Sequence, residues 1–120
     1  MKLFAFSLRE YDEKIYLEKI CKELNIEYGY TSDYPSLDNL HLAKGYDAVS
    51  IITNPTDSKM LDILKSYGVK AISTRSIGYD HIDYEYAKSI GIKVCNVSYS
   101  PNSVANYTIM MILMACRKID

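Results

Sequence analysis

The sequence predicts an α/β domain in which helices cover both faces of a parallel β-sheet. Short apolar runs alternate along the chain with segments whose apolar residues recur at helical spacing. The run at 47–53 (DAVSIIT) is apolar on both faces, as expected for a central strand of a parallel sheet. Repeated strand–helix–strand units of this kind predict a doubly wound open sheet.

The first half of the chain contains two strand candidates and two helix candidates. The strands are expected at residues 2–6 and 26–30. The helix expected at 12–24 carries a stripe of apolar side chains formed by Tyr16, Leu17, Ile20, Cys21 and Leu24. A weaker helix is expected at 36–44, ending near Gly45.

Capping residues and glycines define two helices of the second half. One begins in the segment 54–57 (NPTD), continues to Tyr67 and stops at Gly68. The next is capped by Asp83, runs to Ile90 and stops at Gly91. The fourth and fifth strands are expected before and after that helix, at 69–74 and 92–97.

The last helix differs from the others in its apolar surface. It opens at Ser100, an expected N-cap followed by proline at the first helical position, and extends to about Lys118. Residues 109–116 are apolar all round, whereas a surface helix has an apolar face toward the core and a polar face toward solvent. A second domain or a second subunit is therefore expected to cover it.

Five strands in this alternation fit the flavodoxin-like strand order 2-1-3-4-5, and 120 residues allow one compact domain. Ligands on such sheets bind beyond the carboxyl ends of the strands. The segments expected there are 7–11, 53–56, 74–80 and 98–102.

Composition excludes several classes of protein. The net charge of −1 leaves no basic field for nucleic acid or anionic lipid, and no apolar stretch is long enough to span a bilayer. No secretory signal is visible at the start of the sequence. Cys21, Cys95 and Cys116 are widely spaced, which predicts reduced, buried thiols in a cytoplasmic protein.

Two loops carry possible chemistry. In the first, at 74–80, Gly78 removes a side chain where backbone must turn or approach a ligand, and successive N–H groups there can form a nest for a carboxylate. In the second, Tyr99 offers a hydroxyl donor just before the helix start at Ser100. An ordinary turn at Gly78 and a packing role for Tyr99 remain open alternatives.

Other polar residues predict less. His81 has no neighbours at metal-ligand spacing, which favours a turn or capping role, and His41 is expected to be solvated. Asp12 and Glu13 suit a helix start, and Arg9 is either solvated or able to reach a bound acid. The glycine-rich dinucleotide fingerprint G-x-G-x-x-G does not occur in these residues.

The stretch 70–118 resembles the D-isomer-specific 2-hydroxyacid dehydrogenases, most closely their D-lactate dehydrogenase branch, which includes the vancomycin-resistance dehydrogenases. The resemblance rests on the motifs RSIGYDHID (75–83) and YSPNSVANY (99–107) and on their separation. It covers about two-fifths of the chain strongly, and residues 1–69 fit more loosely. Asn106 departs from relatives, which usually carry an acid there.

The resemblance implies a hydride transfer between NADH and a 2-keto acid, such as pyruvate, to give a D-2-hydroxy acid such as D-lactate. It implies that the amides of Ser76, Ile77 and Gly78 hold the substrate carboxylate, that Tyr99 lies over the substrate, and that Val104 lies toward the nicotinamide. The His, Glu and Arg that such enzymes use for catalysis lie later in their chains. No catalytic residue is therefore expected here, and the 120 residues are expected to be inactive alone.

The same resemblance divides the chain into two parts. Residues 1–100 are expected to form the flavodoxin-like substrate-binding domain. Residues 101–120 are expected to form a helix that crosses to an NAD-binding domain and packs at a homodimer interface.

Two other functions compete with this interpretation. A stand-alone carboxylate-binding or regulatory module would keep the nest without chemistry. A receiver-type signalling domain has the same fold but needs clustered acids at the first and third strand ends, which read 7–9 (SLR) and 53–55 (TNP) here.

Overall fold

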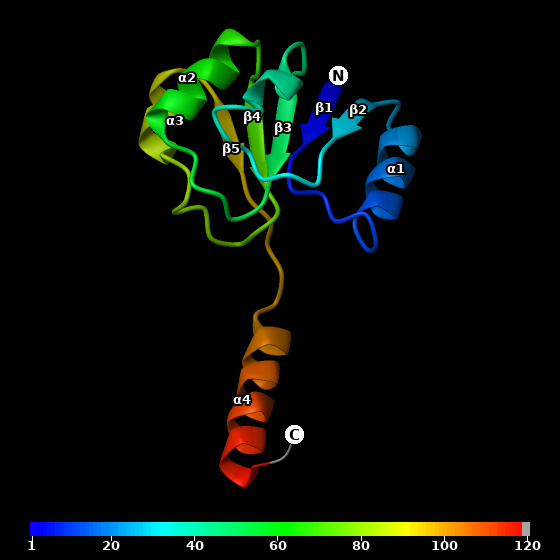
Figure 1. The fold of residues 1–120 in the computed structure, drawn as a ribbon, viewed down its shortest axis with the longest axis vertical. Helices are drawn as coiled ribbons and strands as arrows, with labels where there is room; N and C mark the ends of the chain where they lie inside the picture. Colours follow the sequence, from blue (N-terminus) through cyan, green and yellow to red (C-terminus); the bar gives the residue numbers. More distant parts are fainter. Residues whose placement is uncertain (119–120) are drawn as a thin grey trace.

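The computed structural model describes residues 1–118 and has the predicted architecture, a parallel five-stranded sheet in the order β2-β1-β3-β4-β5 (Figure 1). The strands are β1 (Lys2–Ala5), β2 (Glu27–Tyr30), β3 (Ala48–Ile51), β4 (Ala71–Thr74) and β5 (Lys93–Cys95). The helical segments are α1 (Lys14–Glu23), the 3-10 turn η1 (Leu40–Ala43), α2 (Ser58–Ser66), α3 (Tyr84–Ser89) and α4 (Asn102–Arg117).

The helices α2 and α3 lie on one face of the sheet, and α1 lies on the other, beside β2 (Figure 1). The hydrophobic core fills the space between the sheet and the α2–α3 layer. Its fully buried side chains include those of Phe6, Val49, Ile51, Leu61, Leu64 and Ile72. Burial of such side chains is the main favourable contribution to folding, so this layer stabilises the sheet.

Local capping chemistry sets the ends of α2 and α3 where the sequence predicts them. The Asp57 carboxylate accepts a hydrogen bond from the Met60 N–H at 2.9 Å. The Asp83 carboxylate accepts one from the Tyr86 N–H at 3.1 Å. Gly68 and Gly91 follow these helices with φ of +95° and +76°, a left-handed conformation that glycine adopts without a steric penalty.

The helix predicted at 36–44 is wrong for most of its length, because only η1 is helical there. The side chain of Asn39 explains the difference. Its Oδ1 accepts the Ser36 N–H at 2.8 Å and its Nδ2 donates to the Tyr34 carbonyl at 2.8 Å. These bonds offer the backbone an alternative to a helical turn.

The helix α1 begins two residues later than predicted, and its apolar stripe is mostly exposed. Glu13 is the residue before the helix, and its carboxylate accepts the Arg9 N–H at 2.9 Å instead of capping the helix. Cys21 is the one buried residue of α1, and burial raises the pKa of its thiol. Tyr16 and Leu24 remain 65% and 64% exposed.

The prediction of buried thiols is wrong for two of the three cysteines, although all three are free. Cys95 is exposed because it lies on the edge strand β5, on the face opposite the buried core. Cys116 is exposed because it lies on α4.

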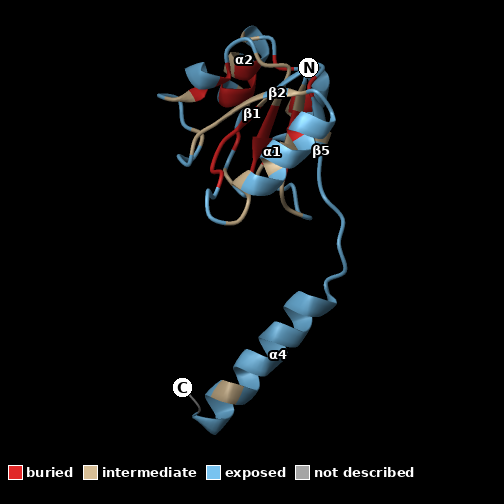
Figure 2. Ribbon diagram, turned by 90° about the vertical axis from the view of Figure 1, so that its right-hand side faces the viewer, coloured by how far each residue is buried: buried red, intermediate tan, exposed pale blue. Residues whose placement is uncertain are grey.

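The helix α4 stands apart from the sheet at the end of an extended linker (Figures 1 and 2). It starts one residue later than predicted: Pro101 is the residue before the helix, and the Ser100 hydroxyl lies 3.4 Å from the Asn102 nitrogen. None of its residues is buried, and only Met114 is half-buried. Residues 119–120, included in the predicted interdomain segment, lie outside the described part.

Within residues 1–118, no helix combines the length and apolar character needed to cross a membrane. Because no residue of α4 is buried, its apolar surface has no cover from the described part of its own chain.

Candidate carboxylate-binding site

All five strands are parallel, so their carboxyl ends meet at one edge of the sheet. Two connections meet at this edge, the loop 75–83 that follows β4 and the linker 96–101 that follows β5. The α4 helix extends from the same edge (Figure 1). The turn at 76–79 that carries Gly78 is half-buried at Ser76 and exposed from Ile77 onward.

The four carbonyl groups of the turn each accept a hydrogen bond from the protein, that of Tyr79 from the Ile82 N–H at 3.0 Å. The Ser76 carbonyl accepts the Val97 N–H at 3.2 Å. The Ile77 carbonyl accepts a hydrogen bond from the Asn96 amide nitrogen at 2.7 Å, and the Gly78 carbonyl accepts one from the Ser76 hydroxyl at 2.8 Å. The turn is therefore held in place through its carbonyl groups, and two of the donors, from Asn96 and Val97, belong to the segment after β5.

The N–H groups of the turn are in the opposite situation. The peptide bonds of the described residues are all trans, so each N–H points away from the carbonyl of its own peptide group. No acceptor within residues 1–118 takes the N–H of Ser76, Ile77, Gly78 or Tyr79. Successive unpaired N–H groups on a fixed, exposed turn can bind an anion such as a carboxylate.

Gly78 is not required by the fold of its own chain. The left-handed glycines among residues 1–118 are Gly45, Gly68 and Gly91, and Gly78 has no such conformation. A Cβ atom added to Gly78 would meet only the Asp80 carboxylate oxygen, at an ordinary contact distance of 3.9 Å. The space above the turn is therefore open to a molecule from outside.

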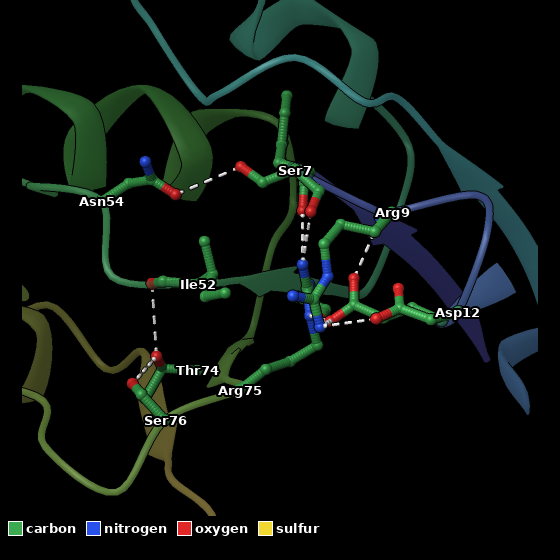
Figure 3. Close-up of polar contacts among 11 residues, drawn as sticks. Ser7, Arg9, Asp12, Ile52, Asn54, Thr74, Arg75 and Ser76 are labelled. Atoms are coloured by element: carbon green, nitrogen blue, oxygen red, sulfur yellow. Dashed lines mark hydrogen bonds and ion pairs between the residues drawn. The ribbon is translucent and has the colours of Figure 1, made fainter. Parts of the chain in front are cut away.

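Arg75 precedes the turn, and its side chain runs across the carboxyl ends of the neighbouring strands (Figure 3). One guanidinium nitrogen donates to the Ser50 hydroxyl at 2.9 Å. The other donates to the carbonyls of Phe6 and Ser7 at 3.1 and 2.8 Å. Ser7 is buried and left-handed, with φ of +54°, so Arg75 holds a strained bend at the end of β1.

The charge of Arg75 is balanced by a carboxylate. Its Nε lies 3.4 Å from Glu13 Oε1, close enough for an ion pair but without the geometry of a hydrogen bond. Burial lowers the pKa of Arg75, and the Glu13 carboxylate opposes that change. This guanidinium is therefore committed to structure and is not free to bind a ligand.

Arg9 is paired in the same cluster. Its guanidinium lies 3.2 Å from Asp12 and 3.3 Å from Glu13, and the Glu13 carboxylate raises its pKa. Arg9 is half-exposed, as the sequence suggests, but acidic partners hold it at the start of α1 (Figure 3). The anion-binding capacity of this edge thus rests on backbone N–H groups.

The structure places the remaining predicted residues as follows. Tyr99 lies on the linker two residues after Val97 and is 55% exposed. Val104 lies on the detached α4 helix and is not brought near the turn. His81 lies in a turn, as predicted, and the exposed His41 bonds to the Asp38 carbonyl at 2.9 Å.

Sequence reasoning missed the residues that fix the turn, above all Asn96. Its position inside the predicted fifth strand, 92–97, hides its role, because a strand residue is expected to continue the ladder. The ladder in fact ends at Cys95, and Asn96 and Val97 turn toward residues 76–77 instead.

This fold and this turn define a class of α/β domain that exposes unpaired backbone N–H groups at the carboxyl edge of its sheet. Residues 3–111 match the family described as D-isomer specific 2-hydroxyacid dehydrogenase, catalytic domain. The chain belongs to this family.

Two relatives and one solved structure illustrate the similarity. The aromatic 2-oxoacid reductase of Clostridium sporogenes is 39% identical over 99% of this chain and 36% of its own length. The D-lactate dehydrogenase of Escherichia coli is 34% identical over 99% and 36%. The apo-structure of the latter enzyme superposes with a TM-score of 0.85 and 33% identity, covering 99% of this chain and 39% of that chain.

A second solved structure is that of a D-isomer specific 2-hydroxyacid dehydrogenase from Lactobacillus delbrueckii ssp. bulgaricus, in an NAD complexed form. It superposes with a TM-score of 0.77 and 26% identity, over 99% of this chain and 37% of that chain. The chain therefore spans little more than a third of the length of these relatives.

Proposed function

We propose that this chain is the substrate-binding part of an NAD-dependent D-2-hydroxyacid dehydrogenase. The reaction is the reduction of a small 2-keto acid, such as pyruvate, to a D-2-hydroxy acid such as D-lactate. The observation that carries the proposal is the turn at 76–79, whose carbonyls are held by the protein while the N–H groups of Ile77, Gly78 and Tyr79 stay unpaired. A substrate carboxylate is the guest that fits this arrangement.

The chain's own residues bind and orient the substrate in this proposal. The amides of the segment Ser76, Ile77 and Gly78 hold the carboxylate, together with the unpaired N–H of Tyr79 at the end of the same turn. The hydroxyl of Tyr99 reaches over the bound acid from the linker. When bound, the nicotinamide supplies the hydride to the keto carbon. The His, Glu and Arg side chains that such enzymes use for acid–base chemistry and for holding the keto acid belong to a part of the enzyme outside these 120 residues.

The proposed division of the chain follows the detached helix. Residues 1–100 form the flavodoxin-like substrate-binding domain, and the segment 101–120, which contains α4, leads to an NAD-binding domain. Val104, 58% exposed near the start of α4, faces the cofactor side of the cleft in this arrangement. The exposed apolar side chains of α4 support the proposal, because a second domain and a homodimer partner would cover them.

We propose a cytoplasmic location for the enzyme. Three free cysteines, two of them exposed, are compatible with a reducing compartment.

The binding proposal is tested by titrating the 15N-labelled chain with oxamate, a non-reactive analogue of pyruvate. The expected result is that the amide resonances of residues 76–79 shift most. Gly78→Val is expected to abolish these shifts, because its side chain fills the open space above the turn, while the unfolding midpoint stays close to that of the wild type. Shifts centred elsewhere, or unaffected by the variant, would contradict the carboxylate site.

The same titration with phenylpyruvate compares a small keto acid with an aromatic one, since the name of the Clostridium relative specifies aromatic substrates. Tighter binding of phenylpyruvate than of pyruvate would contradict the small-substrate part of the proposal. With pyruvate and NADH, the chain alone is expected to give no loss of nicotinamide absorbance. Turnover would contradict the placement of the catalytic groups beyond this sequence.

A further inference from the structure

A hydrogen-bonded path through the side chains of His81, Thr74 and Ser76 lies beneath the turn. The Thr74 hydroxyl oxygen lies 3.0 Å from His81 Nε2 and 2.6 Å from the Ser76 hydroxyl. The Ser76 hydroxyl donates to the Gly78 carbonyl at 2.8 Å. Thr74 is completely buried, so solvent does not compete for its hydroxyl. The hydrogen-bonded path ends at the Gly78 carbonyl, which belongs to the same peptide group as the Tyr79 N–H.

The number of hydroxyl protons fixes which group donates and which accepts at each step of this hydrogen-bonded path. A carbonyl only accepts, so Ser76 uses its single hydroxyl proton on Gly78. The contact between the two hydroxyls then requires Thr74 to donate to Ser76. Thr74 has no second proton, so in its contact with His81 it must accept, and His81 Nε2 must carry the donated proton. The competing contact from Thr74 to the Ile52 carbonyl is longer, at 3.3 Å (Figure 3).

The backbone around His81 is well anchored, unlike the exposed turn. The His81 carbonyl accepts the Thr56 N–H at 2.8 Å, and the Thr56 carbonyl accepts the Asp83 N–H at 3.1 Å. The neighbouring side chain of Ile82 is buried in the core. The hydrogen-bonded chain therefore links a fixed point of the fold to a peptide group at the surface.

We propose that His81 is a positioning residue that acts through Thr74 and Ser76 to orient the peptide group between Gly78 and Tyr79. With the Gly78 carbonyl turned inward, the Tyr79 N–H points toward the open space above the turn. His81 never touches the ligand in this arrangement. Its effect on carboxylate binding rests on the proposed function of the turn, but its tautomer does not.

The tautomer is tested first, in the ligand-free chain labelled with 15N on its histidines. At about pH 8, where histidine is mostly neutral, NMR correlations of the imidazole nitrogens are expected to show the His81 proton on Nε2. A His81 proton on Nδ1, with Nε2 bare, would overturn the inference whatever the ligand of the turn is.

The second test compares paired variants by oxamate titration. His81→Gln keeps an N–H donor near the position of Nε2 and is expected to bind oxamate about as well as the wild type. His81→Leu removes the donor and is expected to weaken binding about tenfold, the effect of one lost buried hydrogen bond. Equal weakening in both variants would show that packing alone matters and would overturn the positioning role.

Thr74→Ser and Thr74→Val provide a second pair, which also serves if the histidine variants fold poorly. The serine keeps the relaying hydroxyl and is expected to bind oxamate like the wild type, whereas the isosteric valine is expected to match His81→Leu. Normal oxamate binding by Thr74→Val would overturn the proposal that His81 acts through Thr74 and Ser76. If the wild type does not bind oxamate while His81 carries its proton on Nε2, the proposed function fails, but the hydrogen-bonded path from His81 to Gly78 stands.

Discussion

The sheet domain and the α4 helix have similar apolar side chains in opposite environments. Leu61 and Ile72 of the domain are completely buried, whereas Ile112 and Leu113 of α4 are 56% and 60% exposed. Hydrophobic stabilisation depends on the area removed from water, so equal composition does not give equal contributions. The core of the domain is complete within this chain, while α4 presents a surface that only another surface can bury.

The largest expected difference is in folding stability. Leu61→Ala leaves a cavity in the α2 layer and is expected to lower the free energy of unfolding by about 2–5 kcal/mol. Leu113→Ala on α4 is the matched control and is expected to change it by less than about 0.5 kcal/mol. Urea unfolding of both variants measures the difference. A comparable loss at Leu113 would mean that α4 is buried against the domain in solution.

Self-association is expected to depend on α4 more than on the exposed residues of α1. Ile112→Asp introduces a charge into the apolar surface and is expected to raise the dissociation constant of the dimer about tenfold or more, equivalent to the burial of one isoleucine. Ile15→Asp is the control on α1, where the side chain is also exposed. Chromatography with light scattering measures both, and an equal effect would place α1 in the interface too.

Removing Arg75 is expected to have a smaller effect on stability than removing Leu61. Arg75→Met leaves the carbonyls of Phe6 and Ser7 without their buried donor, which costs about 1–3 kcal/mol in unfolding free energy. Arg117→Met, an exposed arginine of α4, is the matched control and is expected to be neutral. If urea unfolding finds both variants neutral, Arg75 does not hold the end of β1 in solution.

The smallest expected effect is on the pH dependence of stability, and it belongs to the domain alone. The Lys2 N–H and the Lys70 ammonium hold the pKa of Asp47 below its usual value. The stabilisation is therefore present above the unfolded pKa and is lost as the pH falls through the lower folded value, below about pH 4. Asp47→Asn is expected to reduce the difference in urea midpoint between about pH 7 and pH 3. An unchanged difference would contradict this assignment.

Features fixed by chemistry between near neighbours were predictable from the sequence. Asp57 and Asp83 cap helices through bonds that span three residues, and the alternation of strands and helices is enough to give the order of the sheet. The turn at 76–78 was also predictable, through its motif and the family resemblance. Whether these amides hold a substrate carboxylate stays a prediction.

The rest depends on contacts between residues distant in the sequence, or on side chains that compete with the backbone. Asn39 replaces a helical turn with its own hydrogen bonds, which residue type alone does not reveal. Asn96 reaches the Ile77 carbonyl only because β4 and β5 are neighbours. The position of α4 was not predictable for a different reason. Its apolar surface indicates that a partner must cover the helix, but it does not indicate where that partner lies relative to the sheet.

The parallel pairing of every strand has a consequence for how the chain acquires its structure. No pair can close through a hairpin; Lys2 meets Glu27 and Leu3 meets Ala48, so each pairing waits for a long intervening segment. Loop-closure entropy must be overcome before these contacts form, which makes such sheets slow to fold. On the ribosome, the outer edge of β4 stays unprotected until residues 93–95 have emerged, and during that interval it is open to pairing with other nascent chains.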